Sequence, residues 1–369
     1  MINNINLYQF KRFKNEDIEL FPLTLLTGVN GKGKSTVIQA LLVLRQSFDR
    51  GELQNHSRIV LEDRDLINLV SPDAVLYSNP ESSSVGITFE VDNGSFGKWF
   101  FNAEGESNTL PLSKTDFTKE IYETALFSKT FQYLNAERLG PRIDYERLTA
   151  TRPHSPIGYR GEFVADRILK ALTDNETCEL GKLGEGQPIY ELLSYWMSEI
   201  LYPGTKVMVN LRGNQIEISY SFKEDQQKTF NPLNIGFGFS YALSVILALI
   251  TAKPGSLLII ENPEAHLHPK GQSRIGMLMA LVAESGVQII SETHSDHVLN
   301  GIRVIAKGKS QYGRITPDNV RVYFFHDTEE FEGHISNKRA ISVHADGKLS
   351  DWPNGFFDEW ENNLKKIIR

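Results

Sequence analysis

One stretch of the chain has the spacing of a phosphate-binding loop. Residues 28–36 read Gly-Val-Asn-Gly-Lys-Gly-Lys-Ser-Thr and fit the pattern G-x-x-x-x-G-K-S/T. Glycines let backbone N–H groups close around phosphate oxygens, and the N-terminus of a following helix adds its dipole. We expect Lys34 to neutralise the β and γ phosphates of a nucleoside triphosphate and Ser35 to bind Mg²⁺. The expected nucleotide contacts in this loop are Gly28, Asn30, Gly31, Lys32, Gly33, Lys34, Ser35 and Thr36.

A second candidate site lies far downstream. Four apolar residues, Leu257 to Ile260, precede Glu261 in the string Glu-Asn-Pro-Glu-Ala-His-Leu-His-Pro. Ligands of open α/β sheets bind at the carboxyl ends of strands, so Glu261 is a candidate for holding the hydrated Mg²⁺ with Ser35. An apolar strand that ends in Glu is by itself weak evidence for a magnesium site. The presence of a phosphate loop in the same chain makes that evidence strong.

A third motif follows the apolar run 287–290. It continues as Ser-Glu-Thr-His-Ser-Asp-His, and we expect His294 to contact the γ-phosphate as a hydrogen-bonding sensor. A histidine at a strand end is more often structural, and it is the order of the three motifs that favours a function.

These residues need a sheet with helices to position them, and the hydrophobic pattern predicts one. From residue 231 onward, helices and short buried strands alternate, which is typical of a parallel sheet. The expected strands lie within 2–27, 85–91, 98–101, 206–221, 257–260, 287–290 and 320–325. The expected helices span 34–48, 187–202, 240–252 with Ser240 as its cap, about 270–284, and a segment capped by Ser295.

Composition bounds the class of protein. With 369 residues, 40% hydrophobic and 23% charged, the chain is an ordinary globular protein of about two domains. The net charge of -7 provides no general attraction for nucleic acid, and a single cysteine excludes an internal disulfide. The longest apolar run, 241–252, has about 12 residues where a membrane span needs about 20. We expect a soluble, cytoplasmic protein without a secretory signal.

The motifs and their order resemble the ABC-type ATPase heads, which include the SMC, Rad50-like and overcoming-lysogenization-defect (OLD) ATPases. The match is closest to short, stand-alone bacterial AAA-family ATPases, which share an opening Phe-x-x-Phe, the strings that begin at Glu261 and Glu292, and a tail like 352–359. The resemblance implies an α/β P-loop NTPase: a mixed-sheet core with an antiparallel β subdomain and a helical insertion, without long coiled coils. It implies one head, 1–369, whose core is 1–50 and 231–369, with the β subdomain and helical insertion in 51–230.

The resemblance also implies a homodimer that encloses ATP. One subunit's phosphate loop would face the partner's signature segment, for which the best candidate is Gly236, Gly238 and Ser240 before a helix; the alternative is a simple helix cap with a glycine turn. Related heads place the region of Lys11 and Phe13 near the adenine. In the string 136–142, which recurs in the resembling group, the arginines would touch phosphate or the partner, or form surface ion pairs.

One departure from the family concerns catalysis. ABC heads usually end the acidic strand in Asp-Glu, and the Glu acts as general base, but here the pair is Glu261-Asn262. Asparagine cannot accept a proton at neutral pH. Glu264 is the candidate base; alternatively it caps the following helix and hydrolysis is slow. We predict slow turnover that depends on dimerisation or on a partner.

Three functions compete. The first is an ATP-driven switch that controls a separate effector from a neighbouring gene, in bacterial anti-phage defence. The second is an ATPase component of DNA processing, although only about 75 residues follow His294 and they hold no Asp-x-Asp pair for a nuclease. The third is a protein that senses ATP without hydrolysing it. This alternative remains because Asn262 occupies the usual position of the general base.

Overall fold

The computed structural model describes residues 1–63, 66–105, 107–145, 147, 155–225, 228–331 and 334–368. The chain divides into two compact units. The first is Met1–Phe21, Val29–Phe131 and Phe325–Lys338, and the second is Pro22–Gly28, Gln132–Phe324 and Arg339–Arg369.

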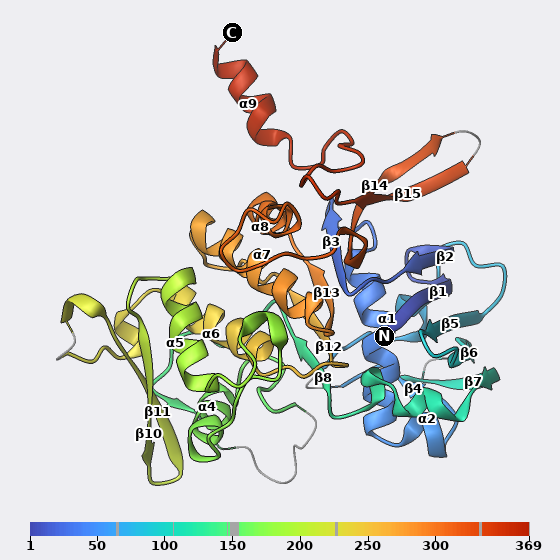
Figure 1. Ribbon diagram of the computed structural model, residues 1–369. Helices are drawn as coiled ribbons and strands as arrows, with labels where there is room; N and C mark the ends of the chain where they lie inside the picture. Colours follow the sequence, from blue (N-terminus) through green and yellow to red (C-terminus); the bar gives the residue numbers. More distant parts are fainter. Residues whose placement is uncertain are drawn as a thin grey trace. The chain divides into compact units, whose positions relative to one another are not determined.

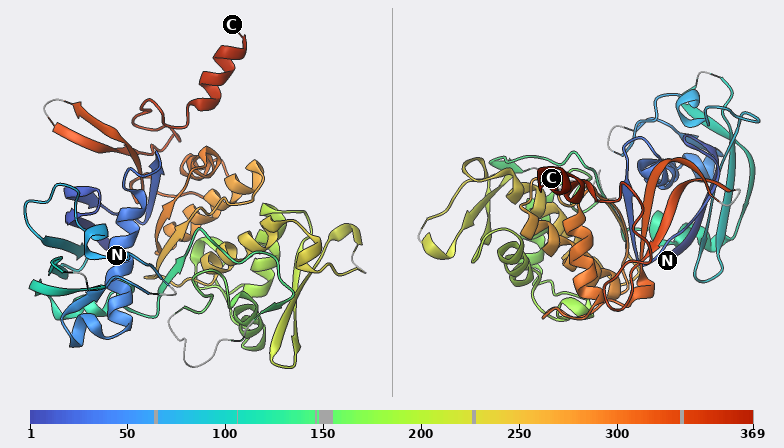
Figure 2. Two further views of the ribbon diagram at one scale, coloured as in Figure 1. Left: turned by 180° about the vertical axis from the view of Figure 1, so that it is seen from behind. Right: turned by 90° about the horizontal axis from the view of Figure 1, so that it is seen from above.

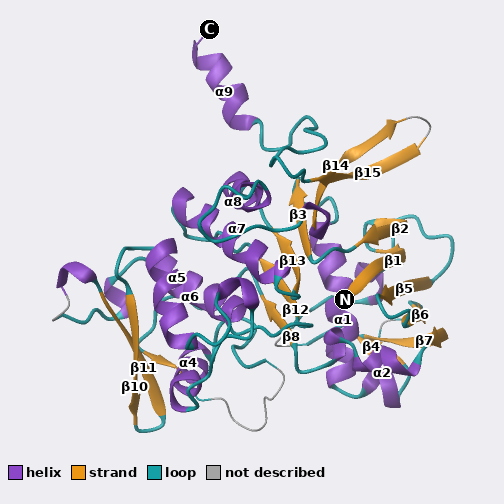
Figure 3. Cartoon of the chain, viewed as in Figure 1, coloured by secondary structure: helices purple, strands orange, loops and turns teal. Residues whose placement is uncertain are grey.

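The first unit contains an antiparallel sheet (Figures 1 and 3). The strand order is β2-β1-β5-β6-β7-β4. Apolar side chains alternate with polar ones along β1 and β6, which is the pattern of a sheet with one buried face. The strands predicted over 85–91 and 98–101 are confirmed as β5 and β6, which pair as an antiparallel hairpin. The strands are β1 (Ile2–Phe10), β2 (Phe13–Glu19), β4 (Arg58–Val60), β5 (Ser84–Val91), β6 (Phe96–Asn102) and β7 (Thr109–Phe117).

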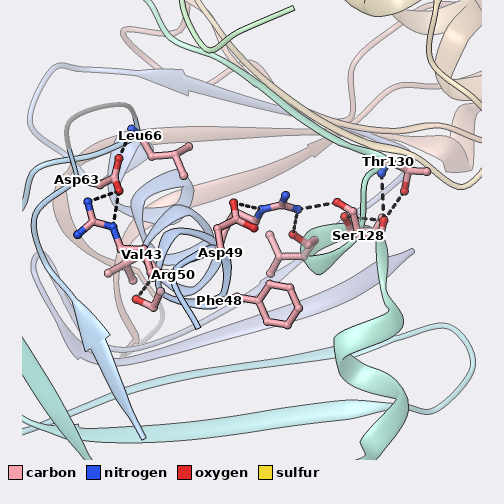
Figure 4. A network of polar contacts seen from close by, with 12 residues as sticks. Val43, Phe48, Asp49, Arg50, Asp63, Leu66, Ser128 and Thr130 are labelled. Atoms are coloured by element: carbon pink, nitrogen blue, oxygen red, sulfur yellow. Dashed lines mark hydrogen bonds and ion pairs between the residues drawn. The ribbon is translucent and has the colours of Figure 1, made fainter. Parts of the chain in front are cut away.

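The long helix of this unit is α1 (Lys34–Asp49), and it begins inside the phosphate-loop motif. Its apolar residues between Val37 and Leu44 are fully buried. Buried Arg45 anchors the far end of the helix: its guanidinium bonds to Asp49 at 2.8 Å and to the Ser128 carbonyl at 2.7 Å. Figure 4 labels Asp49 and Ser128 within this network of polar contacts. The shorter helices here are α2 (Glu52–Asn55), α3 (Pro72–Val75), η1 (Lys119–Glu123) and η2 (Ala125–Phe127).

A second sheet, mainly in the second unit, carries the predicted motif strands. Its order is β15-β14-β3-β13-β12-β8. The pairs β3–β13 and β13–β12 are parallel, and nearly every residue of these three strands is buried. The strands are β3 (Leu23–Gly28), β8 (Phe131–Leu134), β12 (Leu257–Glu261), β13 (Gln288–Glu292), β14 (Val320–Phe331) and β15 (His334–Ser342).

Helices pack around this sheet to form the core of the second unit. Helices α7 and α8 approach so closely that a Cβ on Gly301 would lie 2.0 Å from the carbonyl oxygen of Ser273. The helices are α4 (Val164–Thr173), α5 (Ile189–Ile200), α6 (Phe237–Ile250), α7 (Pro269–Glu284), α8 (Asp296–Ala306) and α9 (Glu359–Ile368), with η3 (Gly181–Leu183), η4 (Lys223–Asp225), η5 (Pro232–Asn234) and η6 (Pro317–Asn319).

A small third sheet lies beside α4 and α5 (Figures 1 and 2). It consists of β9 (Asp144–Tyr145), β10 (Lys206–Arg212) and β11 (Gln215–Ser221), in the order β10-β11-β9. The strand predicted within 206–221 is therefore a hairpin that turns at Gly213 and Asn214.

The predicted α/β fold is confirmed, with two corrections of detail. Ser240 does not cap a helix: α6 begins at Phe237, Gly236 is its N-cap, and Ser240 lies inside the helix. The late strand predicted over 320–325 is the first half of the longer β14, which pairs with β15. Within the described residues, the longest helices are the 16-residue α1 and α7, too short for coiled-coil arms. None of the described helices is long and apolar enough to cross a bilayer.

Candidate functional site

The phosphate loop, in the first unit from Val29 onward, has the backbone conformation that its glycines allow. Gly31 and Gly33 have φ of 75° and 120°, a region that residues with a side chain rarely occupy. A Cβ on Gly33 would lie 2.6 Å from the ring of Phe13, so the side of the loop that faces β2 has no room for one. Helix α1 starts immediately after Gly33 and has no side-chain cap. The loop therefore brings a helix N-terminus to the position where the motif predicts phosphate.

Lys34 is buried in this loop. It is 3% exposed, and its Nζ donates a hydrogen bond to the carbonyl oxygen of Val29 at 3.0 Å. An ammonium group held inside a loop of backbone amides is the charge that a phosphate would complement. The buried cation and the left-handed glycines fit the predicted triphosphate.

The β14–β15 hairpin supports the same loop within the first unit. The N–H of Val29 donates to the Phe325 carbonyl at 2.9 Å, and Lys32 forms an ion pair with Asp327. The hydrogen bond from Lys32 lowers the pKa of Asp327. Asn337 also donates to the Lys32 carbonyl at 3.4 Å. Lys32 is therefore tied to the hairpin, a contact that the sequence did not indicate.

The residues expected near the adenine lie between and on the first two strands. Lys11 is in the β1–β2 turn at φ 52°, and burial lowers its pKa. Phe13 is buried, with its ring under Gly33 and 6.3 Å from that of Phe325. The ring of Phe13 therefore supports the loop and is not exposed for stacking on a base, while Lys11 remains a prediction.

In the second unit, three parallel strands end side by side. Glu261 of β12 is the register partner of Glu292 of β13, and Glu292 is also the partner of Leu26 in β3. Two residues beyond Leu26, β3 ends at Gly28, the first residue of the phosphate loop. The end of β12 at Glu261, called the acidic strand end below, therefore lies two strands away from the start of the phosphate loop.

Polar contacts from β8 and from the segment after it fix the Glu261 carboxylate. The Tyr133 hydroxyl donates to Oε1 at 3.0 Å, and the N–H of Ala136 donates to Oε2 at 3.3 Å. Burial and the neighbouring charge of Glu292 raise the pKa of Glu261 despite these bonds. A bound cation would relieve the repulsion between the two carboxylates, so the residues fit a magnesium ion. No cluster of three or more His, Cys, Asp or Glu suited to a metal occurs among the described residues. In proteins Mg²⁺ usually keeps several waters and is bound by one or two carboxylates together with the phosphates of the substrate.

Arg138 is a buried residue of this site that we expected at a phosphate, at a partner or on the surface. Its guanidinium donates to the carbonyl oxygens of Glu261 at 2.7 Å and Asn262 at 2.5 Å. It also lies over the ring of Tyr241 in α6, with Cζ 5.3 Å from the ring centroid. Burial lowers the pKa of Arg138 to about 10. The side chain therefore joins the acidic strand end to α6.

Glu264 connects the loops after β12 and β13. Its two carboxylate oxygens accept hydrogen bonds from the Thr293 hydroxyl and from the backbone N–H of His294, both at 2.8 Å. The alternative that Glu264 caps the following helix is wrong, because His268 is the N-cap of α7. The His294 side chain is 43% exposed, and its Nε2 lies 3.8 Å from Oε1 of Glu292.

The candidate signature segment lies at the start of α6. Gly236 is the helix N-cap, and a Cβ on Gly238 would lie 2.7 Å from the carbonyl oxygen of His266. Phe237 is 56% exposed, whereas Ser240 is 6% exposed inside the helix. The Ser240 hydroxyl is buried in this conformation, and a phosphate contact through it remains a prediction.

Each of the two units thus holds some of the predicted site residues. The second unit brings Glu261, Glu264 and His294 together at adjacent strand ends, and it also contains Gly28 and the start of α6. The first unit holds Val29 to Thr36 with Lys11 and Phe13. Sequence reasoning missed Tyr133 and the role of Arg138, because the four-residue strand β8 has no detectable periodicity.

Comparisons with known proteins agree with this architecture. A family model described as "AAA domain" matches residues 2–151, and one described as "AAA domain, putative AbiEii toxin, Type IV TA system" matches residues 191–300. A third, "Protein of unknown function (DUF3696)", matches residues 315–367. Among curated protein sequences, none matches this chain.

The fold is similar to solved SMC heads. The SMC head bound to the C-winged helix domain of ScpA is 14% identical, with a TM-score of 0.55 over 93% of this chain and 98% of that chain. The SMC head domain from Thermotoga maritima is 14% identical, with a TM-score of 0.46 over 93% and 99%. The Smc head with an extended coiled coil and a ScpA domain from Pyrococcus furiosus is 13% identical, with a TM-score of 0.49 over 100% and 99%.

The class of the protein follows from the fold and the family matches together. The chain has the fold of an ABC-type ATPase head, of the kind found in SMC proteins. With both AAA-domain matches, this confirms the resemblance to ABC- and SMC-like AAA ATPases.

Proposed function

We propose that this protein binds Mg-ATP and hydrolyses it slowly. The observation that carries the proposal is the phosphate loop: left-handed glycines lead directly into α1, and the buried ammonium of Lys34 lies within the loop. Lys34 would neutralise the β and γ phosphates, and backbone amides at the start of α1 would bind their oxygens. The proposed nucleotide contacts are residues 28 and 30–36, with Lys11 beside the base.

Ser35 and Glu261 would hold the magnesium ion, which when bound screens the phosphate charge. Tyr133 and Ala136 already fix the orientation of the Glu261 carboxylate, so little rearrangement is needed there. His294 is exposed at the adjacent strand end and could donate a hydrogen bond to the γ-phosphate.

The wider proposal is a cytoplasmic switch that dimerises around ATP. Gly236 and Gly238 would contact the nucleotide bound by the partner subunit. Phe237 between them is exposed, as expected for an apolar side chain that is covered when the dimer closes. ATP can bridge two subunits through its γ-phosphate and ADP cannot, so hydrolysis would reopen the dimer.

We further propose that the switch controls a separate effector protein, in anti-phage defence. The similar SMC head is bound to a domain of another protein, ScpA. One matching family model carries the description of a putative toxin of a type IV TA system.

The test compares Mg-ATP binding and phosphate release for wild type, Lys34→Ala and Lys34→Met. Lys14→Ala is the control, since Lys14 forms an exposed ion pair with Glu81 outside the loop. We expect both Lys34 variants to lose binding by more than tenfold and Lys14→Ala to match wild type. Binding without phosphate release in wild type would favour the ATP sensor, and wild-type binding by both Lys34 variants would refute the proposed site.

A further inference from the structure

Helix α9 (Figure 1) has no role in the function proposed so far. We propose that α9 is a docking surface for a second copy of this chain, in which the two α9 helices pair antiparallel. The contact needs no nucleotide, and it uses a different surface from the proposed dimerisation around ATP.

The chain is packed against the second unit up to the start of α9. Phe356 is fully buried, and its ring lies 5.3 Å from that of Phe324 and 5.2 Å from that of Trp352. The N–H of Gly355 donates to the carboxylate of Asp358 at 2.9 Å, and the next residue opens the helix. Helix α9 therefore begins at an anchored point of the second unit.

Helix α9 carries an apolar stripe that nothing in the described chain covers. At 3.6 residues per turn, its four apolar side chains share one face: Trp360, Leu364, Ile367 and Ile368. Trp360 is 74% exposed, Ile367 80% and Ile368 75%, and no described residue of the helix is buried. Isolated helices shorter than about 12 residues are marginal in water, so this 10-residue helix needs a packing partner for its apolar face.

The charged residues beside the stripe are arranged for an antiparallel copy. Helical geometry places Glu361 and Lys365 along one edge of the stripe, and Glu359 and Lys366 along the other. Each edge thus runs from acid to base. In an antiparallel pair with twofold symmetry, each edge meets the same edge of the partner in reverse, so acid faces base on both edges. Parallel pairing would instead put acid against acid and base against base.

A pair centred on Leu364 satisfies both the apolar and the charged residues. Trp360 of one helix then faces the partner's Ile368. At 1.5 Å per residue, Glu361 lies only about 3 Å along the helix axis from the partner's Lys365. Glu361 and Lys365 form an ion pair at 2.7 Å within one helix, but they are 61% and 60% exposed, so the partner's charges can join that pair.

A second copy suits this helix better than a membrane surface does. Amphipathic helices that bind anionic lipid carry an excess of Lys and Arg on the polar face, whereas the described residues of α9 hold two acidic and two basic side chains. Acid followed by base is complementary to its own reverse, which only another such helix supplies. Two short helices bury less than the roughly 1,200 Å² of a stable interface, so we expect a weak, reversible dimer.

Sedimentation equilibrium of the full chain without nucleotide tests the pairing, at concentrations up to roughly 0.5 mM to cover weak association. Wild type should form dimers. The double variant Trp360→Ala and Ile367→Ala should associate at least about tenfold more weakly, since it loses much of the apolar area while alanine preserves the helix. Asn362→Ala, on the opposite face of α9, is the matched control and should associate like wild type.

Two charge variants test the antiparallel order. Lys365→Glu with Lys366→Glu makes the charged side chains of the described helix all acidic, and Glu359→Lys with Glu361→Lys makes them all basic. Each variant alone should remain monomeric, and an equal mixture of the two should form mixed dimers. Recovery in the mixture shows that the helix itself survives the substitutions. A mixture that stays monomeric, or either variant dimerising as tightly as wild type, would overturn the charge pairing.

Other results would also refute the docking surface. They are a wild type that is monomeric at the highest concentration, and dimers that Trp360→Ala with Ile367→Ala does not weaken. Binding of wild-type monomers to vesicles of equal parts phosphatidylcholine and phosphatidylserine, lost in that double variant, would assign the stripe to a membrane surface instead. Since no nucleotide is present, these outcomes are independent of whether the phosphate loop binds ATP.

Discussion

Replacing Arg138 with methionine should loosen the acidic strand end. The guanidinium donates three hydrogen bonds to backbone carbonyls, to Asn135 at 3.2 Å, Glu261 at 2.7 Å and Asn262 at 2.5 Å. At about 1–1.5 kcal/mol each, the bonds sum to about 4 kcal/mol. The lowered pKa of Arg138 shows that burial disfavours its charge. The net loss in the free energy of unfolding should therefore be smaller, about 3 kcal/mol. Methionine keeps an unbranched side chain of similar length and removes the three donors, the positive charge and its stacking over the Tyr241 ring.

Urea unfolding and amide hydrogen exchange measure this effect. We expect a lower urea midpoint for Arg138→Met and faster exchange in β12 and in the loop after it, with exchange in β5 and β6 unchanged. Arg142→Met is the control, because Cζ of Arg142 lies 5.9 Å from the centroid of the Tyr145 ring and, among the described residues, its side chain makes no hydrogen bond to the end of β12. An Arg138→Met protein within 0.5 kcal/mol of wild type, a limit of about the usual scatter among surface substitutions, would refute this reasoning.

Three other substitutions test the site and the core. The pKa of Glu261 is raised, so its ionised form costs stability, and that cost appears as pH rises through the raised pKa. Glu261→Gln should raise the melting temperature of the metal-free protein by about 1–3 °C at pH 8 and by less at pH 5; a decrease at pH 8 would contradict this. Gly301→Ala must separate α7 from α8 and should cost about 3 kcal/mol by urea unfolding, whereas Gly181→Ala, with open space around it, should cost far less. Gly33→Ala would collide with Phe13 and should weaken ATP binding more than tenfold by fluorescence titration; unchanged affinity would show that the loop tolerates a side chain.

The local signals of the sequence predicted the elements of the site well. The phosphate loop, the buried strands before Glu261 and Glu292, and the Ser295 cap all depend on neighbouring residues, and the structure has each element where it was predicted. Such patterns arise from periodicity and capping, which are readable without tertiary information.

The contacts that fix the site could not be predicted in the same way. Tyr133 and Arg138 meet Glu261 across more than 120 residues of sequence, and only the pairing of β8 with β12 brings them together. Ser240 was misplaced because a polar residue before an apolar run looks like a cap. Instead, the turn η5 delivers the chain to Gly236, and the hydroxyl of Ser240 is buried within α6.

A double-mutant cycle tests the central claim most directly, namely that the phosphate loop and the acidic strand end act on one metal-bound nucleotide. Mg-ATP affinity is measured for wild type, Ser35→Ala, Glu261→Gln and the double variant. If both side chains hold the same magnesium ion, the second substitution should cost much less once the first is present, with a coupling of about 1 kcal/mol or more. Costs that add to within about 0.5 kcal/mol would mean that the two residues act independently, and would contradict the account.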